Sequence, residues 1–562
     1  MSYRIHKEQS DSGQLIYSYE KNGRKTPLNS LYSPEKEVER FLKKIGEMSQ
    51  HLVIMIGFGN GALVGGLLKS ELYKKNIHFL FIEPFSEVER SESSLALFKK
   101  NKKFSFYYAK DFDTLIFTKY IVKHMSIPIS IQIHPNYSKL DNTVMNDCLK
   151  IIHEGIKTVE IFKNTQSHFA LDWIIEPLLN TRSLTRASTI SSYKDKFKGE
   201  RAILVASGPS LKQHINFLEE NKDTFHIFSV GSALRALLVN NIKPDYTLSL
   251  DAGKVNYDTH FEDLNYDGTL IFETMSHSKI QDTHKGPLIA SRTIADQVSL
   301  LYTKDLYSFT QSSPSVAVLA LQVIAYFGFS EIYFVGQDLA LVDGDYYAAG
   351  IQHHDVVKTI KEEMFVENNQ GQQIGTTQTL KLYLESFEAL IKTLPTELAI
   401  YNLSEYGAKI AGTTFIRESE IAKKSKSEIV VSEGSPVKSS VGAESFIRNF
   451  IIQLQDLQQE LTGVRKRLRR LILSGSVNSK DFSKALRGYR EIKKRVIVEK
   501  IILSNLKFLF NGVSNKIELL SYKPHYTNEE QIELLNEIDN FYLLAVTFTD
   551  EILKDERLIY YK

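Results

Sequence analysis

Three short polar loops, each directly after an apolar run, contain residues whose types suit contact with a phosphorylated ligand. Glycine lets backbone N–H groups approach a phosphate, and a hydroxyl in a first helical turn can donate to it. A carboxylate in such a loop can accept from a ribose hydroxyl or a base amino group. The candidate binding residues are Gly208, Pro209, Ser210, Gly231, Ser232 and Asp251. The alternative is that these residues form structural turns only.

A second group of polar residues follows later in the chain. Gln337 and Asp338 come directly after the apolar run Ile332–Val335, where a carboxylate can orient a ligand or cap a helix. Ser313 and Ser315 precede an apolar helical stretch whose N-terminal dipole would favour an anion. We therefore add these four polar side chains to the candidate site.

Proton transfer and leaving-group stabilisation need further side chains. Tyr347, with Tyr346 as its neighbour, can donate to a departing phosphate. Histidine is the usual base near neutral pH, and His353, His354 and His277 are the candidates. We take Asp338, Tyr347 and His353 as the catalytic set, with packed or solvated side chains as the alternative for each.

A glycine-rich turn also occurs earlier, at Gly57–Gly61, and Glu83 ends the next apolar run. This pattern resembles S-adenosylmethionine-dependent methyltransferases, in which such an acid binds ribose hydroxyls. A tight strand–helix turn without a ligand is the favoured interpretation, because a lone glycine-rich turn is a weak signal.

Short apolar runs alternate with helical stretches in the middle of the chain, which is typical of parallel βαβ units. A helix is expected at Ser315–Phe327. Because parallel strands place their carboxyl ends at one edge of the sheet, the polar loops should meet in one crevice. The expected strands are Ala202–Ala206, His226–Val230, Tyr246–Leu250, Leu270–Glu273, Glu331–Val335 and Leu398–Leu403.

The fold class is α/β, with a central Rossmann-like domain at 196–415 and a smaller N-terminal Rossmann-like domain at 1–140. A helical connector is expected at 141–195. A linker rich in Ser, Lys and Glu follows at 416–443, and a C-terminal helical bundle at 444–562. The apolar stripe of the first bundle helix recurs at three- and four-residue spacing. It consists of Ile447, Phe450, Ile451, Leu454, Leu457, Leu461, Val464, Leu468 and Leu471.

Composition narrows the function classes. The 562 residues include 69 Lys and Arg against 67 Asp and Glu, so no global charge favours a nucleic acid partner. The single cysteine, Cys148, can form no internal disulfide, which fits a reducing compartment. No apolar segment is long enough to span a membrane. We expect a cytoplasmic protein that does not bind nucleic acid.

The combined motifs resemble the motility accessory factor family, which are bacterial flagellin glycosyltransferases. The resemblance is specific over about 185–415 and weaker in the N-terminal part. Its motifs are Ser207–Leu211, Ile242–Asp245, Ser249–Asp251, Gly336–Ala340 and Tyr401–Ile410.

The same central region is similar to bacterial sialyltransferases that use a CMP-activated sugar. Gly208–Leu211 and Gly336–Asp338 match their motifs, and their Ser-Tyr-Ala triplet aligns with Tyr346–Ala348, which implies Tyr347 as a phosphate-side donor. Those enzymes carry the base histidine in a Gly-His pair, where this chain has Gly375-Thr376. The family's base is therefore not carried over.

The resemblance implies transfer of a pseudaminic- or legionaminic-type nonulosonic acid from a CMP-sugar to Ser or Thr hydroxyls of flagellin. It implies an inverting reaction that supports flagellum assembly and motility. The CMP-sugar is a co-substrate with one phosphate, so no cofactor and no bridging metal are expected. The helical C-terminus is the expected flagellin-docking region, with self-packing or homo-oligomerisation as the alternative.

Two other classes of function stay open. The chain can be another nucleotide-using enzyme, such as a pterin pyrophosphokinase or an S-adenosylmethionine methyltransferase. It can also be a non-catalytic flagellin-binding chaperone, which would keep its function without Ser210, Asp251 and Asp338.

Overall fold

The computed structural model describes residues 3–562 except 46–51, 75–76, 92–95, 97, 102, 123, 125–127, 141, 312, 343–363, 428–433 and 522–524. The chain forms two compact units. Unit 1 comprises Met1–Gln166, Leu468–Ala485 and Lys507–Phe541. Unit 2 comprises Ser167–Arg467, Leu486–Leu506 and Tyr542–Lys562. Each unit therefore combines one long continuous stretch with two shorter segments from the C-terminal part of the chain.

Unit 2 is built on a ten-stranded sheet in the order β14-β13-β12-β11-β10-β9-β15-β18-β19, with β8 paired to β13. All of these pairings are parallel among the described residues. The strands are β8 (Ser188–Thr189), β9 (Arg201–Val205), β10 (His226–Val230), β11 (Tyr246–Ser249), β12 (Thr269–Glu273), β13 (Leu288–Thr293), β14 (Ser308–Phe309), β15 (Glu331–Val335), β18 (Ala399–Asn402) and β19 (Thr414–Phe415). The expected parallel sheet is thus confirmed.

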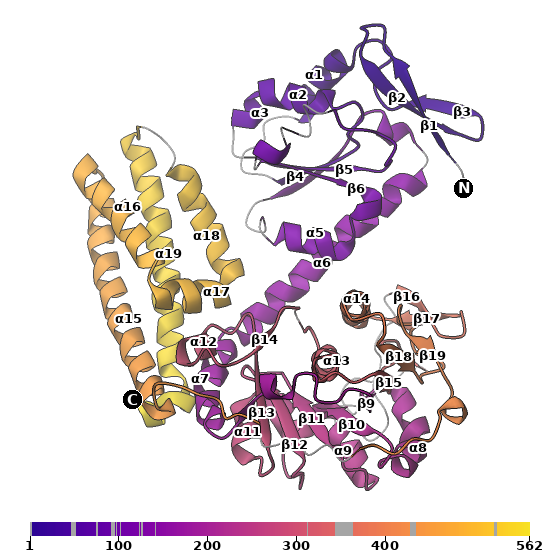
Figure 1. Cartoon of the computed structure of the whole chain (residues 1–562). Helices are drawn as coiled ribbons and strands as arrows, with labels where there is room; N and C mark the ends of the chain where they lie inside the picture. Colours follow the sequence, from indigo (N-terminus) through magenta and orange to yellow (C-terminus); the bar gives the residue numbers. More distant parts are fainter. Residues whose placement is uncertain are drawn as a thin grey trace. The chain divides into compact units, whose positions relative to one another are not determined.

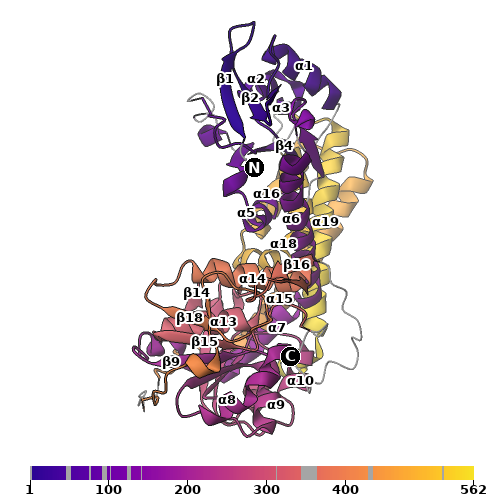
Figure 2. The same cartoon turned by 90° about the vertical axis from the view of Figure 1, so that its right-hand side faces the viewer.

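Helices cover both faces of this sheet, as near-continuous apolar strands require. Helices α13 and α14 lie on one face, and α8 and α9 lie on the other (Figures 1 and 2). The central strands β9 and β10 are buried at every residue. The helices are α7 (Asp172–Leu184), α8 (Ile215–Glu220), α9 (Gly231–Val239), α10 (Lys254–His260), α11 (Ser278–Thr283), α12 (Val298–Tyr302), α13 (Val316–Phe327) and α14 (Gln378–Ile391).

The strand order changes direction between β9 and β15. From β9 the chain builds outward through β10 to β14, and then returns to place β15 on the other side of β9. In open α/β sheets, the crevice at such a switch point, outside the carboxyl ends of the strands, is where ligands bind. The loops after β9 and β15 flank this point.

Helix α13 crosses the sheet beside the switch point. Ser315 caps it, because its side-chain oxygen accepts from the N–H of Val318 at 3.4 Å. Gly328 ends it in the left-handed conformation, with φ at 89°. Nearly the whole helix is apolar and buried. The helix expected at Ser315–Phe327 is therefore confirmed.

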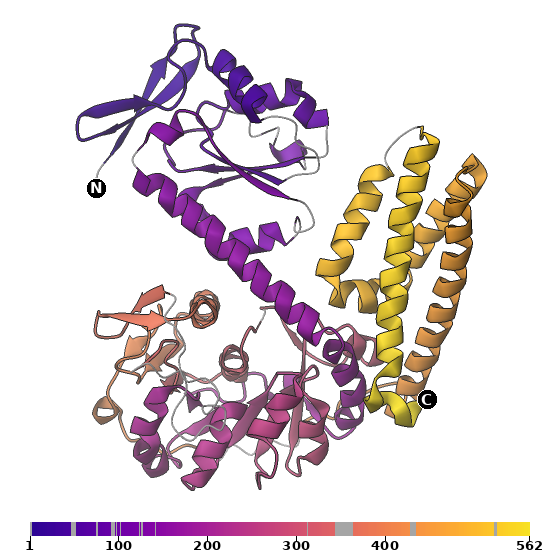
Figure 3. The same cartoon turned by 180° about the vertical axis from the view of Figure 1, so that it is seen from behind.

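Unit 1 contains a parallel sheet in the order β6-β5-β4-β7. Its strands are β4 (Leu52–Ile56), β5 (His78–Glu83), β6 (Phe104–Tyr108) and β7 (Ile129–Ile133). A separate antiparallel sheet, indigo in Figure 3, consists of β1 (Arg4–Gln9), β2 (Leu15–Lys21) and β3 (Arg24–Pro27). Helices α1 (Pro34–Ile45) and α2 (Ala62–Lys69) pack on each other. This architecture agrees with the expected smaller Rossmann-like domain.

The C-terminal part is helical, as expected. The helices are α15 (Ala443–Leu473), α16 (Ser479–Lys493), α17 (Leu503–Asn505), α18 (Lys507–Leu520) and α19 (Asn528–Lys554), with the short helical segments η7 (Ile497–Ile502) and η8 (Glu556–Tyr561). Most of the apolar stripe predicted in α15 is buried, from Ile447 to Leu461. Across the described ranges, no helix combines the length and apolar character needed to cross a membrane.

The segment before α15 is hydrogen-bonded to the rest of unit 2. The N–H of Thr189 donates to the carbonyl of Ser435 at 2.9 Å, and the N–H of Val437 donates to that of Ala187 at 3.0 Å. The Arg201 guanidinium also donates to the carbonyls of Ala422 and Lys424. Parts of the stretch expected as a linker therefore extend the hydrogen bonding of the sheet.

Candidate functional site

A cavity of about 210 Å³ opens at the switch point of unit 2. The loops after β9, β10, β11 and β15 line it, together with the start of α13. This volume is below the roughly 300–1,000 Å³ of a typical small-molecule site, so the cavity is too small to enclose a whole drug-sized ligand. Seven of the predicted site residues line it: Gly208, Gly231, Ser232, Asp251, Ser315, Gln337 and Asp338.

Asp338 holds three loops together at the cavity. One carboxylate oxygen accepts from the N–H of Ser210 at 2.8 Å, and the other accepts from the Ser404 hydroxyl. The Asp338 carbonyl also accepts from the N–H of Ala408 at 2.7 Å. Since Asp338 is only 2% exposed, its carboxylate needs such donors to offset the cost of burial. The side chain that was expected to orient a ligand thus also fixes the site's own loops.

The loop after β9 packs closely against Asp338 and Gly336. A Cβ atom at Gly208 would lie 2.5 Å from both the Asp338 carboxylate and the Gly336 carbonyl, so only glycine fits there. The N–H of Gly208 donates to that carbonyl at 2.8 Å, and the N–H of Ser210 is used by Asp338. The two backbone donors expected to bind a phosphate are therefore already paired within the protein.

Two helix N-termini offer other contacts for an anion. Gly231 and Ser232 begin α9, while Ser315 and Val316 begin α13, and all four residues line the cavity. A helix N-terminus presents unpaired N–H groups and the positive end of its dipole. The cavity contains no Lys or Arg among its described lining residues. Phosphate binding would therefore depend on these dipoles and on hydroxyl groups.

Hydroxyl and amide groups complete the polar lining. The Ser232 hydroxyl donates to the Ser207 hydroxyl at 2.8 Å. Gln337 is 5% exposed, and its side-chain oxygen has no hydrogen-bond partner among the described residues. Because a buried acceptor without a donor is costly, Gln337 is suited to accept from a ligand hydroxyl or amino group.

Asp251 follows β11 and is exposed at the cavity. Sequence reasoning missed three further polar residues that line the cavity, namely Asn256, His260 and Tyr383. Asn256 and His260 lie on the helix that follows β11, which is a position where the βα pattern alone could have suggested them. Tyr383 comes from α14, far along the chain, and no local signal marks it.

Other predicted residues lie elsewhere. Pro209, Ser210 and Ser313 do not line the cavity, and the Ser313 hydroxyl accepts from Gln322 at 2.7 Å. His277 is also absent from the lining and is held by Glu176, whose oxygen lies 2.9 Å from its Nδ1 atom. The predicted catalytic Tyr347 and His353, with Tyr346 and His354, lie outside the described residues.

Glu83 in unit 1 does not have the free carboxylate of a ribose-binding acid. It is fully buried and accepts from the N–H groups of Phe58 and Phe85 and from the Tyr137 hydroxyl, at 2.8, 3.0 and 2.7 Å. Burial raises the pKa of Glu83 to about 7, although these hydrogen bonds oppose the shift. The Tyr137 ring also packs against Gly57 so closely that a Cβ there would lie 2.6 Å away. The Tyr137 ring therefore fills the space at Gly57, whereas Asn60 and Gly61 of the same turn line a cavity of about 1270 Å³.

Within the part of the chain that the structure describes, no group of three or more His, Cys, Asp or Glu side chains could hold a metal ion.

Comparisons of the sequence with known proteins give two partial matches. Residues 177–344 match a family model described as 6-hydroxymethylpterin diphosphokinase MptE-like. An uncharacterized protein of Treponema pallidum (strain Nichols) is 24% identical over 123 residues, which are 21% of this chain and 56% of that protein. The chain thus matches little more than half the length of this relative.

A solved structure matches over nearly the whole chain. The MAf glycosyltransferase from Magnetospirillum magneticum AMB-1 superposes with a TM-score of 0.61 at 15% sequence identity, covering 98% of this chain and 93% of that one. The fold and the cavity define an α/β protein with a cavity at the carboxyl edge of its parallel sheet. Its particular fold is that of this MAf glycosyltransferase, which confirms the predicted fold class.

Proposed function

We propose that this chain is a glycosyltransferase of the motility accessory factor type. It transfers a nonulosonic acid from a CMP-sugar to Ser or Thr hydroxyls of flagellin, in the cytoplasm before export. The observation that carries the proposal is the cavity at the switch point, where the motif residues Gly208, Asp251 and Asp338 meet within a fold shared with a MAf glycosyltransferase. The finer assignments of donor and acceptor rest on the motif resemblance.

The cavity suits the nucleotide part of such a donor. Asp251 and the unpaired oxygen of Gln337 are acceptors for ribose hydroxyls or the cytosine amino group. The N-termini of α9 and α13 favour the single phosphate, whose negative charge grows as the sugar departs. The binding surface therefore combines acceptors for the nucleoside with backbone dipoles for the phosphate.

In the proposed reaction, the acceptor oxygen attacks the anomeric carbon while the bond from that carbon to the phosphate oxygen breaks. CMP leaves with the bonding electrons, and a single displacement inverts the anomeric centre. The acceptor proton passes to a base, for which His353 is the candidate, and Tyr347 donates to the departing phosphate. The reaction needs no metal, because CMP carries no diphosphate to bridge.

Calorimetric titration of CMP tests the nucleotide site. We expect CMP to bind the wild type and to bind Asp251→Ala more weakly, while Asp223→Ala, which changes an exposed aspartate of unit 2 outside the cavity, binds like the wild type. Incubation of purified flagellin with a CMP-nonulosonate should then add the sugar's mass, also in the presence of a chelator. Equal CMP binding by all three proteins would overturn the assignment of the cavity.

A pterin diphosphokinase is the second candidate, and the family match over residues 177–344 favours it. That enzyme class uses ATP with Mg²⁺, so the same titration is repeated with ATP and Mg²⁺. In a separate assay, the protein is incubated with ATP, Mg²⁺ and 6-hydroxymethylpterin, and the reaction products are analysed. Release of AMP with pyrophosphorylation of the pterin, without binding of CMP, would replace the glycosyltransferase proposal. Flagellin binding that survives Asp251→Ala without any nucleotide binding would instead support a chaperone.

A further inference from the structure

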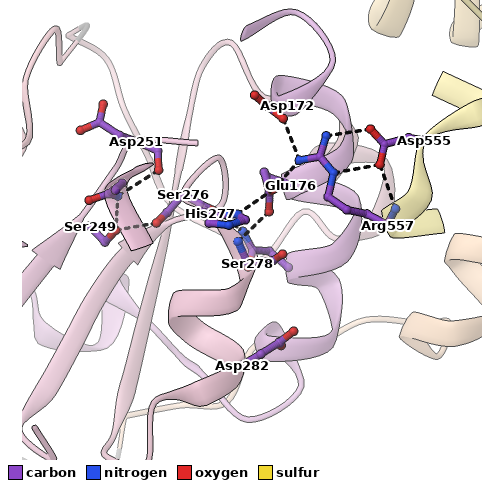
Figure 4. Close-up of polar contacts among 12 residues, drawn as sticks. Asp172, Glu176, Ser249, Asp251, Ser276, His277, Ser278, Asp282, Asp555 and Arg557 are labelled. Atoms are coloured by element: carbon purple, nitrogen blue, oxygen red, sulfur yellow. Dashed lines mark hydrogen bonds and ion pairs between the residues drawn. The ribbon is translucent and has the colours of Figure 1, made fainter. Parts of the chain in front are cut away.

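A buried carboxylate lies beneath the cavity wall in unit 2. Glu176 of α7 is completely buried, and one of its oxygens contacts Nδ1 of His277 at 2.9 Å (Figure 4). Its other oxygen accepts from the N–H of Ser278 at 2.6 Å. Burial acts to raise the pKa of Glu176, but the hydrogen bonds from His277 and Ser278 outweigh it and lower the pKa. Glu176 is therefore a charged anchor for the segment after β12.

Arg557, from the distant segment η8, supplies the balancing charge. Its guanidinium donates to Glu176 at 2.6 Å and to Asp172 at 2.7 Å (Figure 4). Asp555 holds the same guanidinium through two further hydrogen bonds of 2.9 Å. Arginine suits this position because its planar fork serves several carboxylates at once. Without Arg557, the buried Glu176 would lose its nearest full positive charge.

On its other side, the anchored segment supports the end of β11. The N–H of His277 donates to the carbonyl of Asp251 at 3.1 Å, and the hydroxyls of Ser276 and Ser249 lie 2.6 Å apart (Figure 4). The Asn256 amide donates to the same Asp251 carbonyl at 3.0 Å. Asp251, Ser249 and Asn256 all line the cavity. A continuous series of hydrogen bonds thus joins Arg557 to the cavity wall.

We propose that Arg557 and Glu176 are positioning residues for the nucleotide donor. They hold Ser276–Ser278 against the end of β11, and thereby fix where Asp251 and Asn256 stand in the cavity. Neither residue lines the cavity, so both act through the segment after β12. This inference rests on the proposed function for the identity of the donor, whereas the mechanical link can be measured without it.

Arg557→Gln tests the link to donor binding. We expect it to raise the Kd for CMP and the KM for the CMP-sugar about tenfold and to leave kcat within about twofold, because binding geometry is lost while the reacting groups stay. Arg557→Lys should recover part of the affinity, since it restores the charge without the fork. Arg495→Gln is the matched control, because it breaks an exposed two-bond arginine pair with Glu460 elsewhere in unit 2.

Amide hydrogen exchange on the full chain tests the mechanical link by itself. Arg557→Gln should speed exchange over residues 249–256 and 276–278 while residues 201–205 of β9 exchange as in the wild type. If the Arg557→Gln variant unfolds, Asp555→Asn is the alternative, because it weakens the hydrogen bonds that Arg557 donates to Asp555 and leaves Arg557 in place. It should speed exchange at the same amides by a smaller factor.

Unchanged exchange at these amides, or equal acceleration throughout unit 2, would overturn the proposal. Unchanged CMP affinity and KM in Arg557→Gln would overturn it as well. If the wild type binds no CMP, the proposed function fails, and the exchange experiment still decides whether Arg557 controls the cavity wall.

Discussion

The carboxylate of Asp338 accepts the backbone N–H of Ser210 at 2.8 Å, and so ties the loop after β15 to the loop after β9. These loops flank the point where the strand order of the sheet reverses. The Ser404 hydroxyl occupies the second oxygen of the same carboxylate. Asp338 therefore joins the loops around the cavity through its hydrogen bonds. Mutation can separate this structural role from a role in the reaction.

Asp338→Ala should lower the free energy of unfolding of unit 2 by about 3 kcal/mol, because it removes a buried charged acceptor and leaves its donors unpaired. Asp338→Asn keeps one acceptor oxygen and should cost less. Urea unfolding of both variants, followed by CMP titration, measures the effect. If Asp338→Ala proved as stable as the wild type yet unable to transfer sugar, Asp338 would belong to the reaction itself.

Tyr137→Phe should destabilise unit 1 by about 1–3 kcal/mol, since the lost hydroxyl donates to the buried Glu83 and accepts from the N–H of Gly59. Tyr32→Phe is the control, because Tyr32 is 74% exposed. Thermal unfolding gives the stabilities, and a parallel titration with S-adenosylmethionine should show no binding to either variant. Tight binding of that ligand to the wild type would contradict our view that Tyr137 fills the space at Gly57.

Glu273, at the end of β12, should make stability depend on pH. Burial and the neighbouring Asp296 raise the pKa of Glu273 to about 8, so the folded state keeps a proton that the unfolded chain releases. This contribution is fully present below about pH 4.5 and is lost as the pH rises towards 8, with a slope of at most about 1.4 kcal/mol per pH unit.

Glu273→Gln carries a neutral amide at every pH, so it should become more stable relative to the wild type as the pH rises from about 5 to 8. Urea unfolding at several pH values measures this difference. The exposed Glu219→Gln should track the wild type throughout. Parallel curves for wild type and Glu273→Gln would mean that Glu273 is charged in the folded protein.

The sequence was most informative about secondary structure, because strands and helices follow from the local pattern of apolar residues. Apolar runs ending in Gly208, Gly231 and Asp251 predicted parallel strands, and the geometry of parallel sheets then brings their loops together. It was least informative about which hydrogen bonds are already satisfied. No local pattern shows that the Asp338 carboxylate accepts the N–H of Ser210, or that the Tyr137 hydroxyl donates to Glu83. Each of these hydrogen bonds joins residues far apart in the chain.

Roles assigned to Tyr347 and His353 stay predictions, since both lie outside the described residues. Tyr383 and the support from Arg557 escaped sequence reasoning for a physical reason. Tertiary packing alone brings α14 and η8 to their places, and neither helix carries a motif that points to β11.

The link between Glu176 and Arg557 also orders events during synthesis. The two residues are 381 positions apart, so at about 5–20 residues per second a ribosome adds Arg557 roughly 20–75 s after Glu176. Throughout that interval the nascent α7 region carries a carboxylate whose main counter-charge does not yet exist. The cavity wall at the end of β11 can therefore reach its final hydrogen bonding only late in translation, and a chain interrupted before Arg557 would leave the ribosome without that support.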